Sequence, residues 1–142
     1  MASKIKFEMP DFSLALKNAT EKAIEEAGFE MEGTAKQNAP VDSGYYRNNI
    51  KFDGKNQVIA NADYSASIEF GVKAHTIEAK NAKVLHFKVD GKDVFAKSVK
   101  IPERKPNPVM RNAALKVQKE IGGTFTRHFK KELKKNVRTA FI

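Results

Sequence analysis

An aspartate and a serine stand side by side at Asp42-Ser43, within the stretch NAPVDSGYYRNNI that covers residues 38–50. A carboxylate beside a hydroxyl could act as the base that activates a nucleophile. The stretch does not have the strand-turn-helix pattern of a nucleophile elbow, and no particular histidine is placed to activate the serine. The spacing therefore does not favour hydrolysis.

A structural interpretation of the same stretch uses every residue. Pro40 ends a helix, because it excludes the preceding residue from the α region. Asp42 or Ser43 can then accept the free N–H groups of the next turn, and Tyr46 and Ile50 point inward one helical turn apart. We predict a structural corner rather than a catalytic site, and no enzymatic activity.

A metal site would need clustered donors. The three histidines, His75, His86 and His128, show no HExxH pattern and no other ligand spacing, and the chain has no cysteine. We therefore expect no metal and no cofactor. The lack of cysteine also fits a reducing compartment.

Several carboxylates could act as acids or bases. Four of them lie on the first long helical segment, where we expect them to be solvated: Glu25, Glu26, Glu30 and Glu32. Glu69 differs because it stands in an apolar stretch, between Ile68 and Phe70. We expect a half-buried carboxylate in a structural ion pair with Arg47 or Arg111.

The chain is basic, with a formal net charge of +9, and from residue 116 onward it has eight Lys and Arg against two Glu. Such a segment could dock on an acidic protein surface, or it could bind nucleic acid through phosphate contacts. Phe125 and Phe129 could stack on bases, but their spacing of four also suits a packing face. The docking interpretation assigns contact to Lys130, Lys131, Lys134 and Lys135.

With 142 residues, 41% hydrophobic and 30% charged, the chain suits one folded domain over 1–142. No apolar run approaches 18 residues, and the N-terminal MASKIKFEMP lacks the apolar region of a signal peptide. We expect a soluble protein that is not exported. Residues 1–10 should form an N-terminal arm and residues 137–142 a C-terminal tail.

Two long helices are predicted. In residues 11–38 the apolar positions recur at intervals of three and four, with Asp11 or Ser13 as the cap: Leu16, Ala19, Ala23, Ile24, Ala27, Met31 and Ala35. Gly28 and Gly33 mark a bend or a close contact. A second helix should start with Asn107 as cap and Pro108 in its first turn. Its inner positions are Val109, Met110, Ala113, Ala114, Val117, Ile121, Phe125, Phe129, Leu133 and Val137. Whether Gly122-Gly123 breaks or bends this helix stays open.

Two β-hairpins are predicted between the helices. Residues 50–62 read as two short strands around Asp53-Gly54, and residues 82–100 as two longer strands around Asp90-Gly91. The fold class is therefore α+β, with a long N-terminal and a C-terminal helix packed on a small, mainly antiparallel sheet that has a long β-hairpin.

Three stretches together resemble the tail-component proteins of tailed bacteriophages, which include tail-completion, neck and tail terminator proteins. Residues 39–50 (APVDSGYYRNNI) resemble the family pattern APVDTGxLRxSI, residues 62–71 (ADYSASIEFG) resemble xxYAxxxEFGT, and residues 106–115 (PNPVMRNAAL) resemble PxPFxRPAL. The resemblance implies that the following motif residues are framework: Pro40, Asp42, Ser43, Gly44, Arg47, Tyr64, Glu69, Phe70, Gly71 and Pro108.

The resemblance also implies a non-enzymatic virion protein that forms a ring, commonly hexameric, in the neck or at the head-proximal end of the tail. Such a ring ends the tail tube and joins it to the head connector. The implied partners are further copies of the chain, the tail tube protein and the head completion or connector protein, with passing contact with DNA in the channel and no membrane. The implied location is the virion, and the host cytoplasm during assembly. The alternative from the residues alone is a basic nucleic-acid-binding module.

A ring needs contact surfaces between copies. We expect the hairpin over 82–100 to supply an edge and apolar side chains, namely Val84, Phe87, Val94 and Phe95. The alternative is that the hairpin folds back on its own core.

Overall fold

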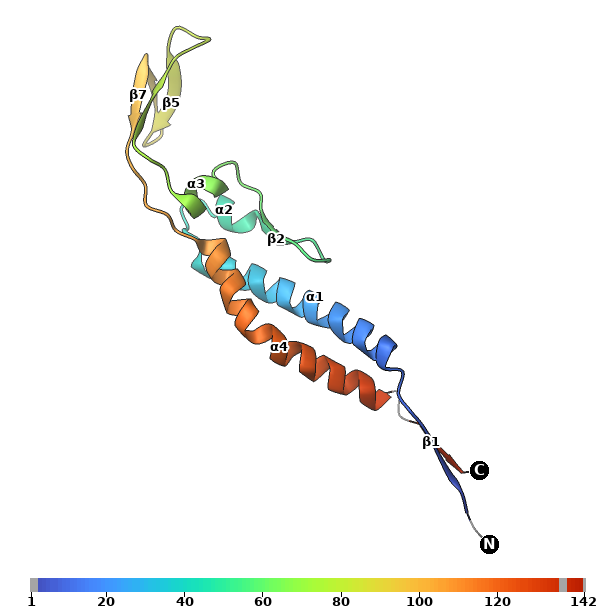
Figure 1. Cartoon of the computed structure of the whole chain (residues 1–142). Coiled ribbons are helices and arrows are strands. Elements are labelled where there is room, and N and C mark those ends of the chain that lie inside the picture. The colour runs from blue at the N-terminus through green and yellow to red at the C-terminus, as the bar shows by residue number, and fades with distance from the viewer. Residues whose placement is uncertain (1–2, 136–137, 142) are drawn as a thin grey trace. The chain divides into compact units, whose positions relative to one another are not determined.

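The computed structural model describes residues 3–135 and 138–141. The chain divides into two compact units, the first made of the residues up to Ala62 and from Val109 onward, the second of Asp63–Pro108. Figure 1 shows their helices and strands. These units are defined by contacts and not by independent folding, so the expectation of one domain over 1–142 stays a prediction.

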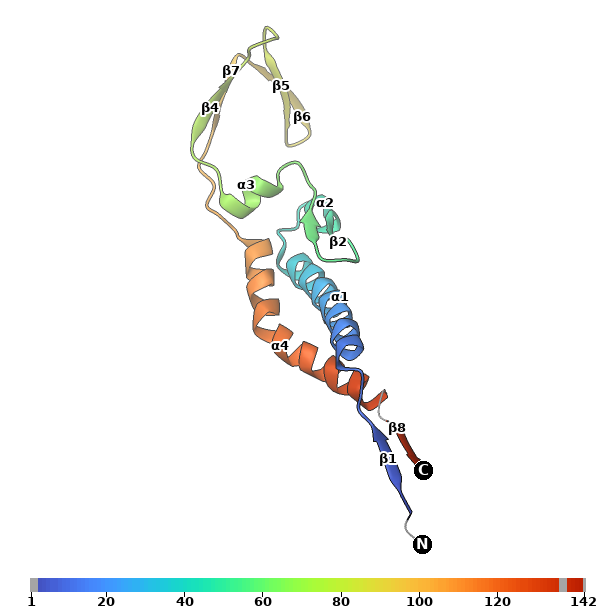
Figure 2. The ribbon, with the colours of Figure 1, turned by 45° about the vertical axis from the view of Figure 1, so that its right-hand side comes forward.

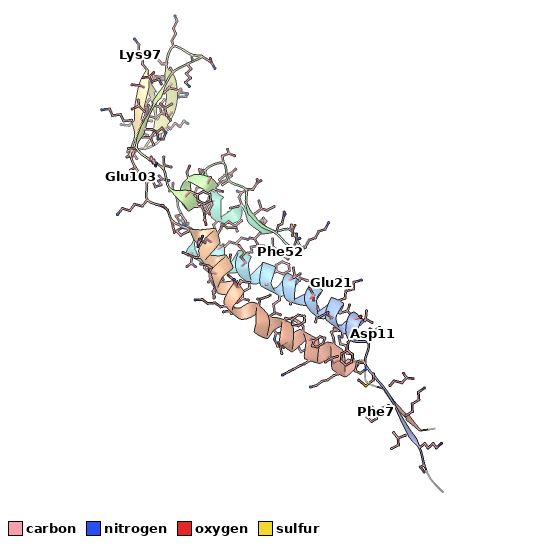
Figure 3. The ribbon with its side chains drawn as sticks, viewed as in Figure 1. Phe7, Asp11, Glu21, Phe52, Lys97 and Glu103 are labelled. Atoms are coloured by element: carbon pink, nitrogen blue, oxygen red, sulfur yellow. The ribbon has the colours of Figure 1, made fainter. Side chains whose placement is uncertain are left out.

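The first unit is built on two long helices, α1 (Phe12–Asn38) and α4 (Val109–Lys135), which pack side by side in both ribbon views (Figures 1 and 2). Asp11 caps α1, because its carboxylate accepts the Leu14 N–H at 3.0 Å; it lies where the helix begins in Figure 3. The side chains Ala15, Ala19 and Ala23 are buried on α1. Small side chains on this face let α4 approach closely.

The inner face of α1 differs from the prediction at two positions. Leu16 is 51% exposed and Ile24 is 38% exposed, while Ala15 is fully buried. The predicted stripe places Leu16 inward by its spacing to Ala19 and Ala23, but Ala15 has an equally good spacing. In the folded helix Ala15, and not Leu16, occupies the inner position.

α4 is one continuous helix through Gly122-Gly123, and its ribbon bends near the middle in Figure 2. Two threonines bond back to the preceding turn there: Thr124 to the Glu120 carbonyl at 3.2 Å and Thr126 to the Gly122 carbonyl at 2.8 Å. Such bonds favour bending, and glycine tolerates it. The predicted inner position Val137 lies outside the described residues.

A short helix and a hairpin complete the first unit. α2 (Tyr45–Asn48) leads into β2 (Ile50–Phe52), which pairs antiparallel with β3 (Val58–Ala60) in the register Ile50↔Ala60. The turn predicted at Asp53-Gly54 is corrected: the loop covers residues 53–57. Within it the Asp53 carboxylate accepts the N–H groups of Lys55, Asn56 and Gln57, which stabilises this longer loop. The predicted hairpin is confirmed.

The chain ends also pair with each other. β1 (Ile5–Glu8) and β8 (Arg138–Phe141) form an antiparallel ribbon in the register Ile5↔Phe141. The sequence predicted only an arm over 1–10 and a tail over 137–142. The alternation of Ile5 and Phe7 with Lys6 and Glu8 is the signal of a strand, but it does not identify its partner.

The second unit begins with α3 (Ser65–Phe70) and contains two antiparallel ribbons (Figure 2). β4 (His75–Glu78) pairs with β7 (Ser98–Ile101), and β5 (Leu85–Val89) pairs with β6 (Lys92–Ala96). The hairpin predicted over 82–100 is confirmed at its turn, where Asp90 and Gly91 both have positive φ, as a tight type I′ turn requires. Its range is corrected: it covers 85–96, and the residues of β7 pair with β4 instead.

The fold is therefore α+β with small antiparallel sheets, as predicted. None of the helices in the described part of the chain is long and apolar enough to cross a membrane.

Candidate assembly surfaces

The corner at residues 40–50 forms part of the core of the first unit. Ser43 Oγ accepts the Tyr45 N–H at 3.3 Å, so of the two predicted capping residues it is Ser43 that meets the start of α2. Tyr46 is 3% exposed and Ile50 is fully buried. Asp42 and Arg47 are exposed. The corner orients two core side chains and directs the chain into β2.

The histidines are engaged away from the corner. His86 Nε2 lies 3.0 Å from an Asp93 oxygen, and its ring stacks on Phe95 at 4.7 Å. His75 Nδ1 bonds to the Lys73 carbonyl, and His128 bonds to Glu26. In the described ranges no cluster of three or more His, Asp or Glu side chains is suited to a metal ion.

The second motif lies in the second unit, around α3. Gly71 follows the helix with φ of 76°, and a Cβ there would lie 2.6 Å from the Arg104 carbonyl oxygen. That close approach lets Val72 and Arg104 exchange two backbone hydrogen bonds, at 2.9 and 2.8 Å. Only glycine suits this position, because both the backbone angle and the contact exclude a side chain.

The other residues of these motifs differ in exposure. Glu69 is half-buried, as expected for a carboxylate in an apolar stretch, whereas Phe70 is 77% exposed and Tyr64 is 41% exposed. Pro108 stands directly before α4, which begins one residue later than predicted. Phe70 therefore lies at the surface, where it could contact another chain.

The β5–β6 hairpin has two different faces. Leu85, Phe87, Val94 and Ala96 are half-buried, and an apolar pocket of about 270 Å³ lies beside them, lined mainly by residues of both ribbons: Ile77, Leu85, His86, Phe87, Val99 and Ile101. Phe95 belongs to the opposite face and is 64% exposed, and Val84 just before the hairpin is 40% exposed. Of the four predicted contact residues, Phe87 and Val94 thus face the unit's own core, while Val84 and Phe95 are available to a partner.

Ion pairs join α1 to α4. The carboxylate of Glu132, which is 4% exposed, accepts hydrogen bonds from Lys22 Nζ at 2.5 Å, Lys135 Nζ at 3.3 Å and Asn18 Nδ2 at 3.4 Å. The Lys22 ammonium is the main reason that the pKa of Glu132 falls to about 2. Sequence reasoning missed this residue, although Glu132 continues the inward spacing of Phe125 and His128.

Three carboxylates of α1 that were expected to be solvated instead have partners. Glu26 bonds to His128 Nε2 at 2.6 Å and to Arg127, and these contacts lower its pKa. Glu32 bonds to Lys36 and accepts the Phe52 N–H at 2.8 Å, which lowers its pKa as well. Glu30 shares a hydrogen bond with Glu120, and that contact raises its pKa. Only Glu25 of the four is exposed as predicted.

Lysines occupy the surface of α4. Lys130, Lys131 and Lys134 are exposed and border a shallow hollow over Gly122 and Gly123. Lys135 belongs instead to the Glu132 network. The predicted set of four is therefore divided between a free surface and the helix pair.

Two further apolar surfaces of the first unit were not predicted. A groove of about 290 Å³ runs between α1, α4 and the β2–β3 hairpin, and its lining includes Met31, Phe52 and Ile121. On the terminal ribbon and just after it, Ile5, Phe7 and Met9 are 61%, 69% and 74% exposed. Exposed apolar side chains in such numbers are typical of contact surfaces.

Comparison with protein families relates part of the chain to a known family. A model of the family described as "Bacteriophage HK97-gp10, putative tail-component" matches residues 4–76. The matched range includes α1, the corner, β2–β3 and α3; residues 106–115, the third motif, lie outside it. No curated protein and no solved structure matches the chain at a significant level.

Proposed function

Because the chain belongs to the HK97-gp10-like family of bacteriophage tail components, we propose that it is a non-enzymatic virion protein whose copies form a ring of six at the head-proximal end of the tail. The ring ends the tail tube and gives the head connector a surface to dock on. The observation that carries this proposal is the family match over half of the chain, which includes the corner and α3. Its partners are further copies of itself, the tail tube protein and the head completion or connector protein.

The structure supports self-assembly in two ways. A closed ring of identical subunits needs two different surfaces on each copy, one meeting the other on the neighbour. Each described sheet has only two strands, so each ribbon has unpaired backbone groups along its edges, and these can accept a neighbour's strand. Exposed Phe95 and Val84 add apolar area beside one such edge.

The β5–β6 hairpin is the proposed ring contact. It can be deleted without removing the β4–β7 pair. Glu78 pairs with Ser98, and the Ala79 N–H donates to the Lys97 carbonyl at 2.9 Å. Replacing residues 80–96 by Asn-Gly should therefore close β4 and β7 with a two-residue turn and leave the first unit intact. We expect this variant to stay monomeric in light scattering. An unchanged oligomer would exclude the hairpin as the contact.

A variant with only surface substitutions tests the contact between copies without deleting part of the fold. Val84→Ser with Phe95→Ser removes exposed apolar groups and the stacking of Phe95 on His86, and Ile59→Ser, which is 46% exposed on the other hairpin, is the control. The double variant should weaken assembly and the control should not. Equal effects of the two would show that surface apolarity in general, and not this hairpin, drives association.

A further inference from the structure

Five exposed lysines lie along one side of α4: Lys116, Lys119, Lys130, Lys131 and Lys134. At 3.6 residues per turn they fall within about a third of the helix circumference. From Lys116 to Lys134 the row extends about 27 Å along the axis. We call these five residues the basic face.

The protein itself neutralises the basic face only in part. Glu26 bonds to Arg127 and His128, and Glu132 bonds to Lys22 and Lys135, so neither carboxylate pairs with the face. Glu120 of α4 shares a hydrogen bond with Glu30 of α1, and Lys116 interacts electrostatically with Glu30. Among the described residues, none of the five lysines forms an ion pair within 4.0 Å. With five lysines against Glu120 and Glu30, the face keeps a net positive charge, which suits a polyanion.

The composition of this face distinguishes among polyanions. Protein interfaces have an apolar centre and are poor in lysine. Between the two groups of lysines, however, this face has Gly122, Gly123 and Thr126, which leave a shallow hollow. Such a surface, which is rich in lysine and has no apolar centre, is typical of sequence-independent contact with phosphates and not of docking on an acidic protein.

The aromatic side chains of α4 favour double-stranded over single-stranded DNA. Proteins that bind single strands offer aromatic rings for the bases to stack on. Phe125 and Phe129 instead stack on each other, with ring centres 5.6 Å apart, and both are half-buried. Each stands five residues before a lysine of the basic face, about 140° away around the helix.

We infer that the basic face of α4 binds the sugar-phosphate backbone of double-stranded DNA without sequence preference. The lysines pair with successive phosphates, and the hollow over Gly122 and Gly123 lets the strand approach the helix backbone. Because this contact needs only α4, DNA binding can be tested independently of ring formation.

The test is binding of a fluorescent duplex of about 20 base pairs of random sequence, measured by anisotropy at several salt concentrations. Each phosphate contact contributes about 0.9 to the slope of log affinity against log salt. Changing all five lysines of the basic face to glutamine should therefore reduce the slope by about 4.5 and weaken binding at 50 mM salt by at least about 100-fold.

The matched control changes five exposed lysines of the second unit to glutamine, which alters the net charge equally: Lys80, Lys83, Lys88, Lys97 and Lys100. This variant should keep most of the affinity and slope, and circular dichroism should show both variants folded. An equal loss in both variants would overturn the inference, because net charge alone would then explain binding. Preference for a single strand, or lysine-dependent binding to an acidic virion protein but not to duplex DNA, would also overturn it.

Discussion

Replacing Gly28 with alanine should destabilise the protein, whereas the same change at Gly33 should stabilise it. A Cβ built on Gly28 would lie 2.2, 2.4 and 2.5 Å from three ring atoms of Phe52. Phe52 lies beside α1 in Figure 3. Because the three atoms form one side of the ring, the whole ring would have to move by more than 1 Å to reach the ordinary contact distance of 3.4 Å.

The ring cannot make this move freely. Phe52 packs edge-on against Phe29, with ring centres 5.1 Å apart, and its backbone N–H is bound to Glu32. Overpacking of this kind costs about 1–3 kcal/mol. Alanine in place of glycine in a helix gains about 1 kcal/mol. The net result at Gly28 is a loss of about 0–2 kcal/mol in the free energy of unfolding.

Gly33 is the matched control on the same helix, because a Cβ there would meet no atom within 4 Å. Gly33→Ala should gain up to about 1 kcal/mol, so the two variants should differ by about 1–3 kcal/mol. Urea unfolding followed by circular dichroism measures both. In a Phe52→Ala background, Gly28→Ala should become stabilising. The reasoning would be refuted if Gly28→Ala stabilised the original protein as much as Gly33→Ala does.

Two further changes probe the core and the ion pairs. Ile50→Ala should cost about 2–5 kcal/mol, because Ile50 is fully buried, whereas Ile59→Ala, which is 46% exposed on the same hairpin, should cost less than about 1 kcal/mol in the same urea assay. For pH, the pKa of Glu132 is about 2 when folded and about 4.3 when unfolded, so its stabilising contribution is complete above about pH 4.3 and is lost as the pH falls toward 2. The melting temperature should therefore decline over that window, and Glu132→Gln should make the decline shallower; an equally steep decline in the variant would contradict the assigned role of Glu132.

Local signals in the sequence were enough to predict the two long helices and the turn of the β5–β6 hairpin. Asp11 as a cap, Pro40 after the first helix and Asp90-Gly91 between alternating strands each act within a few residues, and the structure confirms all three. The pairing of β1 with β8 could not be predicted, because it joins residues 130 to 136 positions apart. Nor could the separation of β7 from the hairpin, since Val99 and Ile101 continue the alternation of β6.

The surfaces were harder to predict than the elements. Spacing alone assigns Phe87 and Phe95 equally to the hairpin, but only the paired register shows that they lie on opposite faces. Similarly, the sequence does not distinguish among the α1 carboxylates Glu26, Glu30 and Glu32. Their different partners are known only once α4 and β2 are packed against α1. Sequence predicts which side chains could make contact, and packing decides which remain available.

The most direct test of the proposed function is the solution mass of the nuclease-treated protein, measured by light scattering at low and moderate salt and repeated with isolated tail tubes. The proposal predicts a discrete closed oligomer with a mass of about six times the 15.9 kDa of one chain, formed alone or on the tube end. A monomer that neither assembles nor binds tail tubes at any salt concentration would contradict it.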